Sequence, residues 1–189
     1  PIMLQNFLNA FVNIIDTVMI GKLGTVELAA VGLGNQLFFL LNLILYGIAS
    51  GSMVFTAQFW GKKDLKGLQK TLGISMSAAV CFSIIFTVCC IRMPGEILSL
   101  YTKDEAVIQT GVRYLSISAW CFIPFAVNFI LMITLRSIEK VRIAVAATSV
   151  SLVVNMTLNA VLIFGLFGAP ALGVRGAAIA TVAARFVEL

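Results

Sequence analysis

The sequence has few charged residues and no histidine. Of its 189 residues, 11% are charged and 60% are hydrophobic, and the mean hydropathy is +1.05. A soluble domain cannot cover its surface with so little charge, so this composition indicates an integral membrane protein. The absence of histidine excludes histidine-ligated metal sites. The cysteines also lack the spacing of zinc or iron–sulfur ligands, so we interpret them as apolar packing residues: Cys81, Cys89, Cys90 and Cys121.

Six apolar segments follow one another along the chain, each close to the roughly 20 residues that a helix needs to cross a membrane. They are residues 2–20, 28–59, 72–93, 112–135, 143–167 and 174–189. We therefore predict an all-α integral membrane fold, with residues 1–189 forming one unit of six transmembrane helices. The chain begins at Pro1, and its last segment covers only about 21 Å of a membrane roughly 30 Å thick. We expect it to be truncated at both ends.

Basic residues gather on one side of the predicted membrane. The even-numbered connections carry seven basic residues against two acidic ones, whereas the odd-numbered connections are nearly neutral. Because lysine and arginine are retained on the cytoplasmic side, the amino terminus is predicted to be cytoplasmic and the location to be the cell membrane. The formal net charge of +5 is accounted for by these loop residues, so no nucleic-acid partner is indicated. The even-numbered connections hold Lys62, Lys63, Lys66, Lys70, Arg136, Lys140 and Arg142.

The first segment has a polar face that includes an acid. Asp16 is the only acidic residue well inside the first five segments, where an ionised carboxylate costs about 2.5–3.5 kcal/mol. Three more polar residues lie within about 80° of it on a 3.6-residue helix, namely Gln5, Asn9 and Asn13. Hydrocarbon offers no hydrogen-bond partner, so this face is expected to meet another helix or a water-filled cavity. The alternative is that Asp16 reaches the lipid headgroups at the end of its helix.

The fifth segment has a matching polar face, formed by Thr148, Ser151, Asn155 and Asn159. Asp16 facing these amides, together with the hydroxyl of Thr181, would make a small oxygen-rich site suited to H⁺ or Na⁺ and to no other metal or cofactor. The asparagines could instead serve only as contacts between helices. Asn35 and Asn42 share a face of the second segment and are further candidates to line the cavity. We interpret Arg185 and Glu188 as an ion pair near the membrane interface.

An ordered set of motifs resembles the multidrug and toxic compound extrusion (MATE) transporters over essentially the whole chain. The motifs are Pro1, Asp16-Thr17-Val18-Met19-Ile20-Gly21, Leu28-Ala29-Ala30-Val31-Gly32, Gln58-Phe59-Trp60-Gly61, Asn155 to Asn159 with Ile163-Phe164-Gly165, and Gly173-Val174-Arg175-Gly176-Ala177-Ala178-Ile179-Ala180-Thr181. The resemblance implies a twelve-helix exporter of two lobes around a central cavity. This chain would be the amino-terminal lobe, and the carboxy-terminal lobe would be its missing partner.

The resemblance also implies roles for individual residues. The acid matching Asp16 binds the coupling H⁺ or Na⁺, with the positions matching Asn155 and Asn159 and a threonine such as Thr181 around it. Pro1 matches a proline at which the first helix bends. Some members of the family carry a second aspartate where this chain has Asn159, so Asp16 would act alone here.

We therefore expect an antiporter that exports drugs, organic cations or other amphipathic compounds, with no catalytic residues. A lipid-linked saccharide flippase of the same superfamily is an alternative, although its cavity should carry several basic residues to receive pyrophosphate. An intramembrane enzyme would need a nucleophile and base, a metal set or paired carboxylates, and the sequence offers no such set. A purely structural subunit would not need the polar faces.

Overall fold

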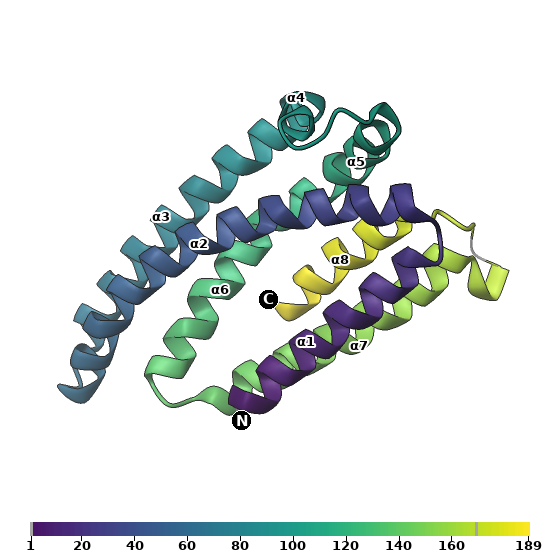
Figure 1. Ribbon diagram of the computed structural model, residues 1–189. Coiled ribbons are helices and arrows are strands. Elements are labelled where there is room, and N and C mark those ends of the chain that lie inside the picture. The colour runs from purple at the N-terminus through teal and green to yellow at the C-terminus, as the bar shows by residue number, and fades with distance from the viewer. Residues whose placement is uncertain (1, 169) are drawn as a thin grey trace.

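The computed structural model describes residues 2–168 and 170–189, and it is helical almost throughout (Figure 1). Pro1 lies outside this description, as do the side chains of Ile2, Leu4, Gln5, Asn6, Leu8, Asn9, Val12, Asn13 and Phe167. The helices are α1 (Ile2–Gly21), α2 (Thr25–Gly61), α3 (Leu65–Arg92), α4 (Pro94–Ser99), α5 (Glu105–Ser118), η1 (Ala119–Cys121), α6 (Phe122–Ser137), α7 (Val141–Phe164), η2 (Leu166–Gly168) and α8 (Val174–Glu188). The all-α prediction is confirmed.

Four stretches within the described residues are long and apolar enough to cross a membrane by length and composition: α2, α3, the continuous stretch Glu105–Ser137, and α7. These stretches correspond to the second to fifth predicted segments. The first and sixth segments are the helices α1 and α8, and both pack along α7. The chain is therefore a multi-pass membrane protein, and within the described residues α1 and α8 join the four long stretches by packing along α7.

Several helices differ in extent from the apolar segments. α3 begins at Leu65 rather than residue 72, because the Asp64 carboxylate caps it by accepting the Gly67 N–H at 3.0 Å. Lys66 and Lys70, predicted to lie in a connection, therefore belong to the helix. The short helix α4 was not predicted; it begins at Pro94, at the first position of a helix, where proline is favoured.

The predicted fourth segment is interrupted by a tight turn of helix. Residues Ala119–Cys121 form the 3₁₀ turn η1 between α5 and α6. Pro124 lies just after this turn, and a proline ring clashes with the carbonyl group four residues earlier. This local change in winding divides one continuous membrane stretch into α5 and α6.

The helices form two packed groups. In one group α7 packs against both α1 and α8, and in the other α3 and α6 pack against α2. Figure 1 shows α1, α7 and α8 side by side. α2 and α3 run together, and α6 lies between them and the α1, α7 and α8 helices. α5 packs against both α2 and α8 and so connects the groups. The main apolar core lies in the second group, where Phe122, Leu41, Leu45 and Leu115 are fully buried.

Candidate functional site

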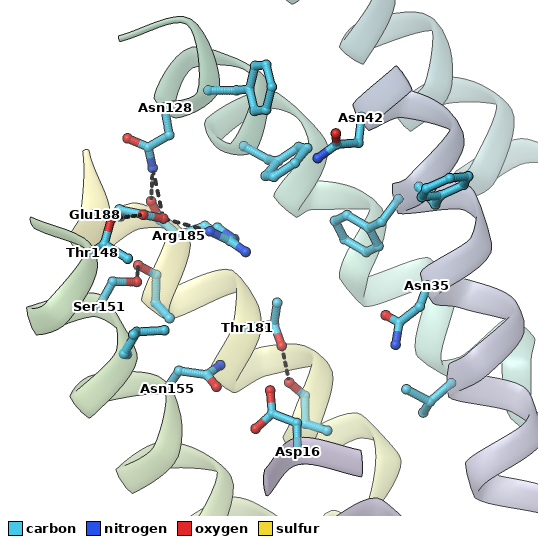
Figure 2. Close-up of a pocket in the computed structure, with 18 of the residues that line it drawn as sticks. Asp16, Asn35, Asn42, Asn128, Thr148, Ser151, Asn155, Thr181, Arg185 and Glu188 are labelled. Carbon is cyan, nitrogen blue, oxygen red and sulfur yellow. Dashed lines mark hydrogen bonds and ion pairs between the residues drawn. The ribbon is translucent and has the colours of Figure 1, made fainter. Parts of the chain in front are cut away.

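A cavity of about 680 Å³ lies between the two groups of helices and is lined by α1, α2, α5, α6, α7 and α8 (Figure 2). Its lining contains every predicted polar site residue whose side chain the structure describes: Asp16, Asn35, Asn42, Ser151, Asn155, Asn159 and Thr181. The sequence thus predicted much of the polar lining. The side chains of Pro1, Gln5, Asn9 and Asn13 lie outside the described residues, so their proposed roles stay predictions.

Asp16 is bound by the fifth predicted segment, as the polar faces indicated. The Asn159 side-chain Nδ2 donates to Asp16 Oδ1 at 2.7 Å and to Asn155 Oδ1 at 3.2 Å. Asn159 is 1% exposed, and Asp16 is half-buried. The carboxylate of Asp16 therefore meets a polar partner on α7, as the first of the two alternatives requires.

The oxygen atoms around Asp16 fit a small hard cation or a proton. The buried Oδ1 of Asn159 has no hydrogen-bond partner among the described residues. Thr181 donates its hydroxyl hydrogen to the Ala177 carbonyl oxygen at 2.9 Å, which leaves the hydroxyl oxygen able to accept a bond or contact an ion. Carboxylate, amide and hydroxyl oxygens are the ligands that hard cations prefer. Burying the Asn159 carbonyl oxygen without a hydrogen bond costs free energy, and a bound cation or a proton donor would offset that cost.

Ser151, one turn before Asn155 on the same face of α7, fixes α8 against α7. Its Oγ donates to the Ala184 carbonyl oxygen at 2.7 Å, and the serine is buried. Small residues on α8 permit this close approach, since Ala177, Ala180 and Ala184 are all buried. The predicted polar face of α7 therefore serves two purposes, holding α8 in place and presenting amides to the cavity.

A second charged cluster, Arg185 with Glu188, lies in the cavity wall. Arg185 Nη1 bonds Glu188 Oε2 at 2.7 Å, so the predicted pair forms. However, Glu188 also accepts from Thr148 Oγ1 at 3.1 Å and lies within 3.5 Å of Asn128 Nδ2. The carboxylate is therefore buried among α6, α7 and α8, a burial that the spacing of the pair did not predict. Asn128, a single amide within an apolar segment, was the signal that could have indicated this.

The opposite wall of the cavity is aromatic and amide-bearing. Figure 2 shows Asn35 and Asn42 on α2, across the cavity from α7 and α8. Between and beside them, rings from α2 and α6 pack edge to face: Phe38 with Phe125 at 6.1 Å between centroids, and Tyr46 with Phe129 at 5.2 Å. The cavity can therefore hold a planar apolar group on one side and polar groups on the other.

Comparison with known proteins decides the family. The MatE family model matches residues 1–161 of the chain. The chain belongs to the MatE family. Curated relatives of this MatE chain include a protein named "Probable multidrug resistance protein NorM" from Rhizobium meliloti, which is 31% identical over 89% of this chain. Another, named "Probable multidrug resistance protein YoeA" from Bacillus subtilis, is 32% identical over 96%.

The MatE chain spans 36% and 40% of the length of these two relatives. Solved structures show the same fold. An outward-facing multidrug resistance MATE family transporter superposes with a TM-score of 0.87 at 20% identity, over 98% of this chain and 40% of that one. A transporter of the MOP superfamily from Pyrococcus furiosus superposes with a TM-score of 0.88 at 21% identity, over 100% of this chain and 41% of that one. The described helices therefore have the fold of part of such a transporter.

Proposed function

We propose that this chain is the amino-terminal lobe of a secondary transporter that exports drugs, organic cations or other amphipathic compounds in exchange for H⁺ or Na⁺. The observation that carries the proposal is the 2.7 Å bond between Asn159 and the carboxylate of Asp16, inside a cavity of about 680 Å³. The naming of the relatives as probable multidrug resistance proteins supports the substrate class. Their greater length supports a second lobe that completes the protein.

The coupling ion acts on the hydrogen bonds of Asp16. An ionised carboxylate only accepts, and it accepts from Asn159 Nδ2 here. A protonated Asp16 also donates, and the unpartnered Oδ1 of Asn159 belongs to the same amide and can accept that hydrogen bond after the amide rotates. A Na⁺ would instead be attracted to the carboxylate and to the neighbouring amide oxygens. Either ion therefore rearranges the contact between α1 and α7.

Export follows if this rearrangement changes how well the cavity holds its substrate. A bound ion shifts a conformational equilibrium only by the difference between its affinities for the two states. Asp16 lies on α1, whereas the cavity wall that faces it is formed by α2 and α6, so a change in the α1–α7 contact alters the shape of the cavity. Alternating access then requires the second lobe, because two bodies must move against each other.

The test is the variant D16N in the full-length protein, reconstituted into lipid vesicles. Efflux of a fluorescent organic cation is driven first by a pH gradient and then by a Na⁺ gradient. We expect D16N to insert normally and to lose efflux under the gradient that drives the wild type, which also identifies the ion. The matched control is D64N, since Asp64 is an exposed helix cap and asparagine caps equally well. Gradient-driven efflux that persists in D16N would rule out the coupling role.

A further inference from the structure

The charged pair in the cavity wall presents only one of its partners to a ligand. The side chain of Glu188 is 6% exposed and that of Arg185 is 36% exposed. Both carboxylate oxygens of Glu188 already accept hydrogen bonds: Oε1 from Thr148, and Oε2 from Arg185 at 2.7 Å. A ligand in the cavity therefore meets the guanidinium and not the carboxylate behind it.

The guanidinium of Arg185 is held in a fixed position. Glu188 binds one of its nitrogens, and its central carbon lies 5.2 Å from the centroid of the Phe125 ring. A guanidinium carries five N–H donors in one plane. Among the described residues, Glu188 accepts from one nitrogen of Arg185, so most of the donors remain for a ligand. Figure 2 shows the side chain of Arg185 reaching from α8 into the space between α8 and the wall of α2.

The carboxylate of Glu188 lowers the cost of holding the Arg185 guanidinium in the cavity wall. An isolated charge would be costly here, but Glu188 neutralises Arg185 from behind. A second group that accepts hydrogen bonds can then bind the front of the same guanidinium in the charge-assisted, often bidentate manner typical of arginine. A cation could occupy this position only by displacing Arg185 from both Glu188 and Phe125.

Aromatic rings continue the site beyond Arg185. Phe125 lies under the guanidinium and packs at 6.1 Å between centroids against Phe38 and also against Phe129. These rings belong to the cavity lining together with Arg185. A planar ligand can therefore pack against them while a substituent reaches the guanidinium.

We propose that Arg185 and the aromatic wall of Phe38, Phe125 and Phe129 form a binding subsite for aromatic compounds that carry an acidic or strongly hydrogen-bond-accepting group. The proposal rests on the export function and narrows it. Among the amphipathic compounds that the exporter would carry, this subsite selects those with a carboxylate or similar group over purely cationic ones.

The test uses two probes that share a naphthalene ring: 2-naphthoate and (2-naphthylmethyl)trimethylammonium. Their binding to the full-length protein in lipid nanodiscs is measured by equilibrium dialysis, with empty nanodiscs correcting for partition into lipid. Substituting Arg185 alone would leave a buried carboxylate unpaired, so the main variant is R185Q/E188Q, which keeps the pair neutral. R185K keeps the charge but loses the planar fork. The matched control is R92Q, because Arg92 is an exposed residue at the end of α3.

We expect the wild type to prefer naphthoate, and R185Q/E188Q to bind naphthoate at least about tenfold more weakly, with its affinity for the ammonium probe within about twofold of the wild type. R185K should lose several-fold, and R92Q should match the wild type. The proposal is overturned if R185Q/E188Q keeps its naphthoate affinity, if both probes weaken together, or if the wild type prefers the ammonium probe or binds neither. If R185Q/E188Q does not fold, the test uses R185K: weaker naphthoate binding with unchanged binding of the ammonium probe supports the subsite, and unchanged naphthoate binding overturns it.

This measurement uses no ion gradient. Failure of the coupling proposal appears as efflux by D16N, and failure of the subsite appears as unchanged naphthoate binding, so the two results are separate.

Discussion

Replacing Gly176 by alanine should force α8 away from α7. A Cβ atom at this position would lie 2.5 Å from the carbonyl oxygen of Leu162 and 2.7 Å from its carbonyl carbon. Both are backbone atoms of α7 and cannot rotate out of the way. The same carbonyl oxygen also accepts the N–H of Leu172 at 2.9 Å, so moving it strains the connection between the two helices.

The size of the effect follows from the geometry. Ordinary contact begins near 3.4 Å, so the helices must separate by roughly 1 Å at this crossing, and such overpacking costs about 1–3 kcal/mol. Alanine gains about 0.5–1 kcal/mol over glycine within a helix. The loss of contacts should outweigh this gain, since the Ser151 bond to α8 depends on the same helix spacing.

Gly47 provides the matched control. It lies within α2, and a Cβ added there would meet nothing within 4 Å. G47A therefore changes helix propensity alone and should be neutral or slightly stabilising. Thermal unfolding of the full-length protein in nanodiscs measures both variants. Equal melting temperatures for G176A and G47A would refute the argument that α7 and α8 pack through this glycine.

Two further changes test the polar contacts of α8. S151A removes the 2.7 Å bond to the Ala184 carbonyl oxygen and should cost about 0.5–1.5 kcal/mol in thermal unfolding; S77A, which loses only a bond within its own helix, is the control. R185M leaves the buried Glu188 carboxylate without its cation and should lower the free energy of unfolding by about 3 kcal/mol. The stability of R185M/E188M should be closer to that of the wild type. A double variant whose loss of stability equals the sum of the losses in R185M and E188M would contradict the pairing.

Polar residues in the sequence indicated the lining of the cavity because a membrane leaves them few other partners. Asp16 and Asn159 are 143 positions apart in the sequence, yet they bond to each other. Each needs a polar partner within the bundle, because hydrocarbon offers none. Asn35 and Asn42 followed from the same reasoning, with one helix face supplying both. In a soluble protein an asparagine could equally have faced water, so the inference would have been much weaker.

Other features depended on information that periodicity does not carry. Arg185 and Glu188 are three residues apart on one helix, a spacing that predicts their pairing but not which helices surround them. The burial of Glu188 depends on Thr148 and Asn128, which come from two other helices. The helix boundaries also differed from the apolar segments, because capping by Asp64 extends α3 into polar sequence.

The contact between α7 and α8 links stability to the chemistry of the cavity. One face of α7 carries Ser151 against α8 and, one and two turns later, the amides of Asn155 and Asn159 at the carboxylate of Asp16. α8 in turn carries Thr181 and Arg185 into the same cavity. Because small residues bring these backbones together, the position of α8 sets the distance between the two charged clusters. A displacement of α8 along this contact would therefore move Arg185 relative to the amides of Asn155 and Asn159.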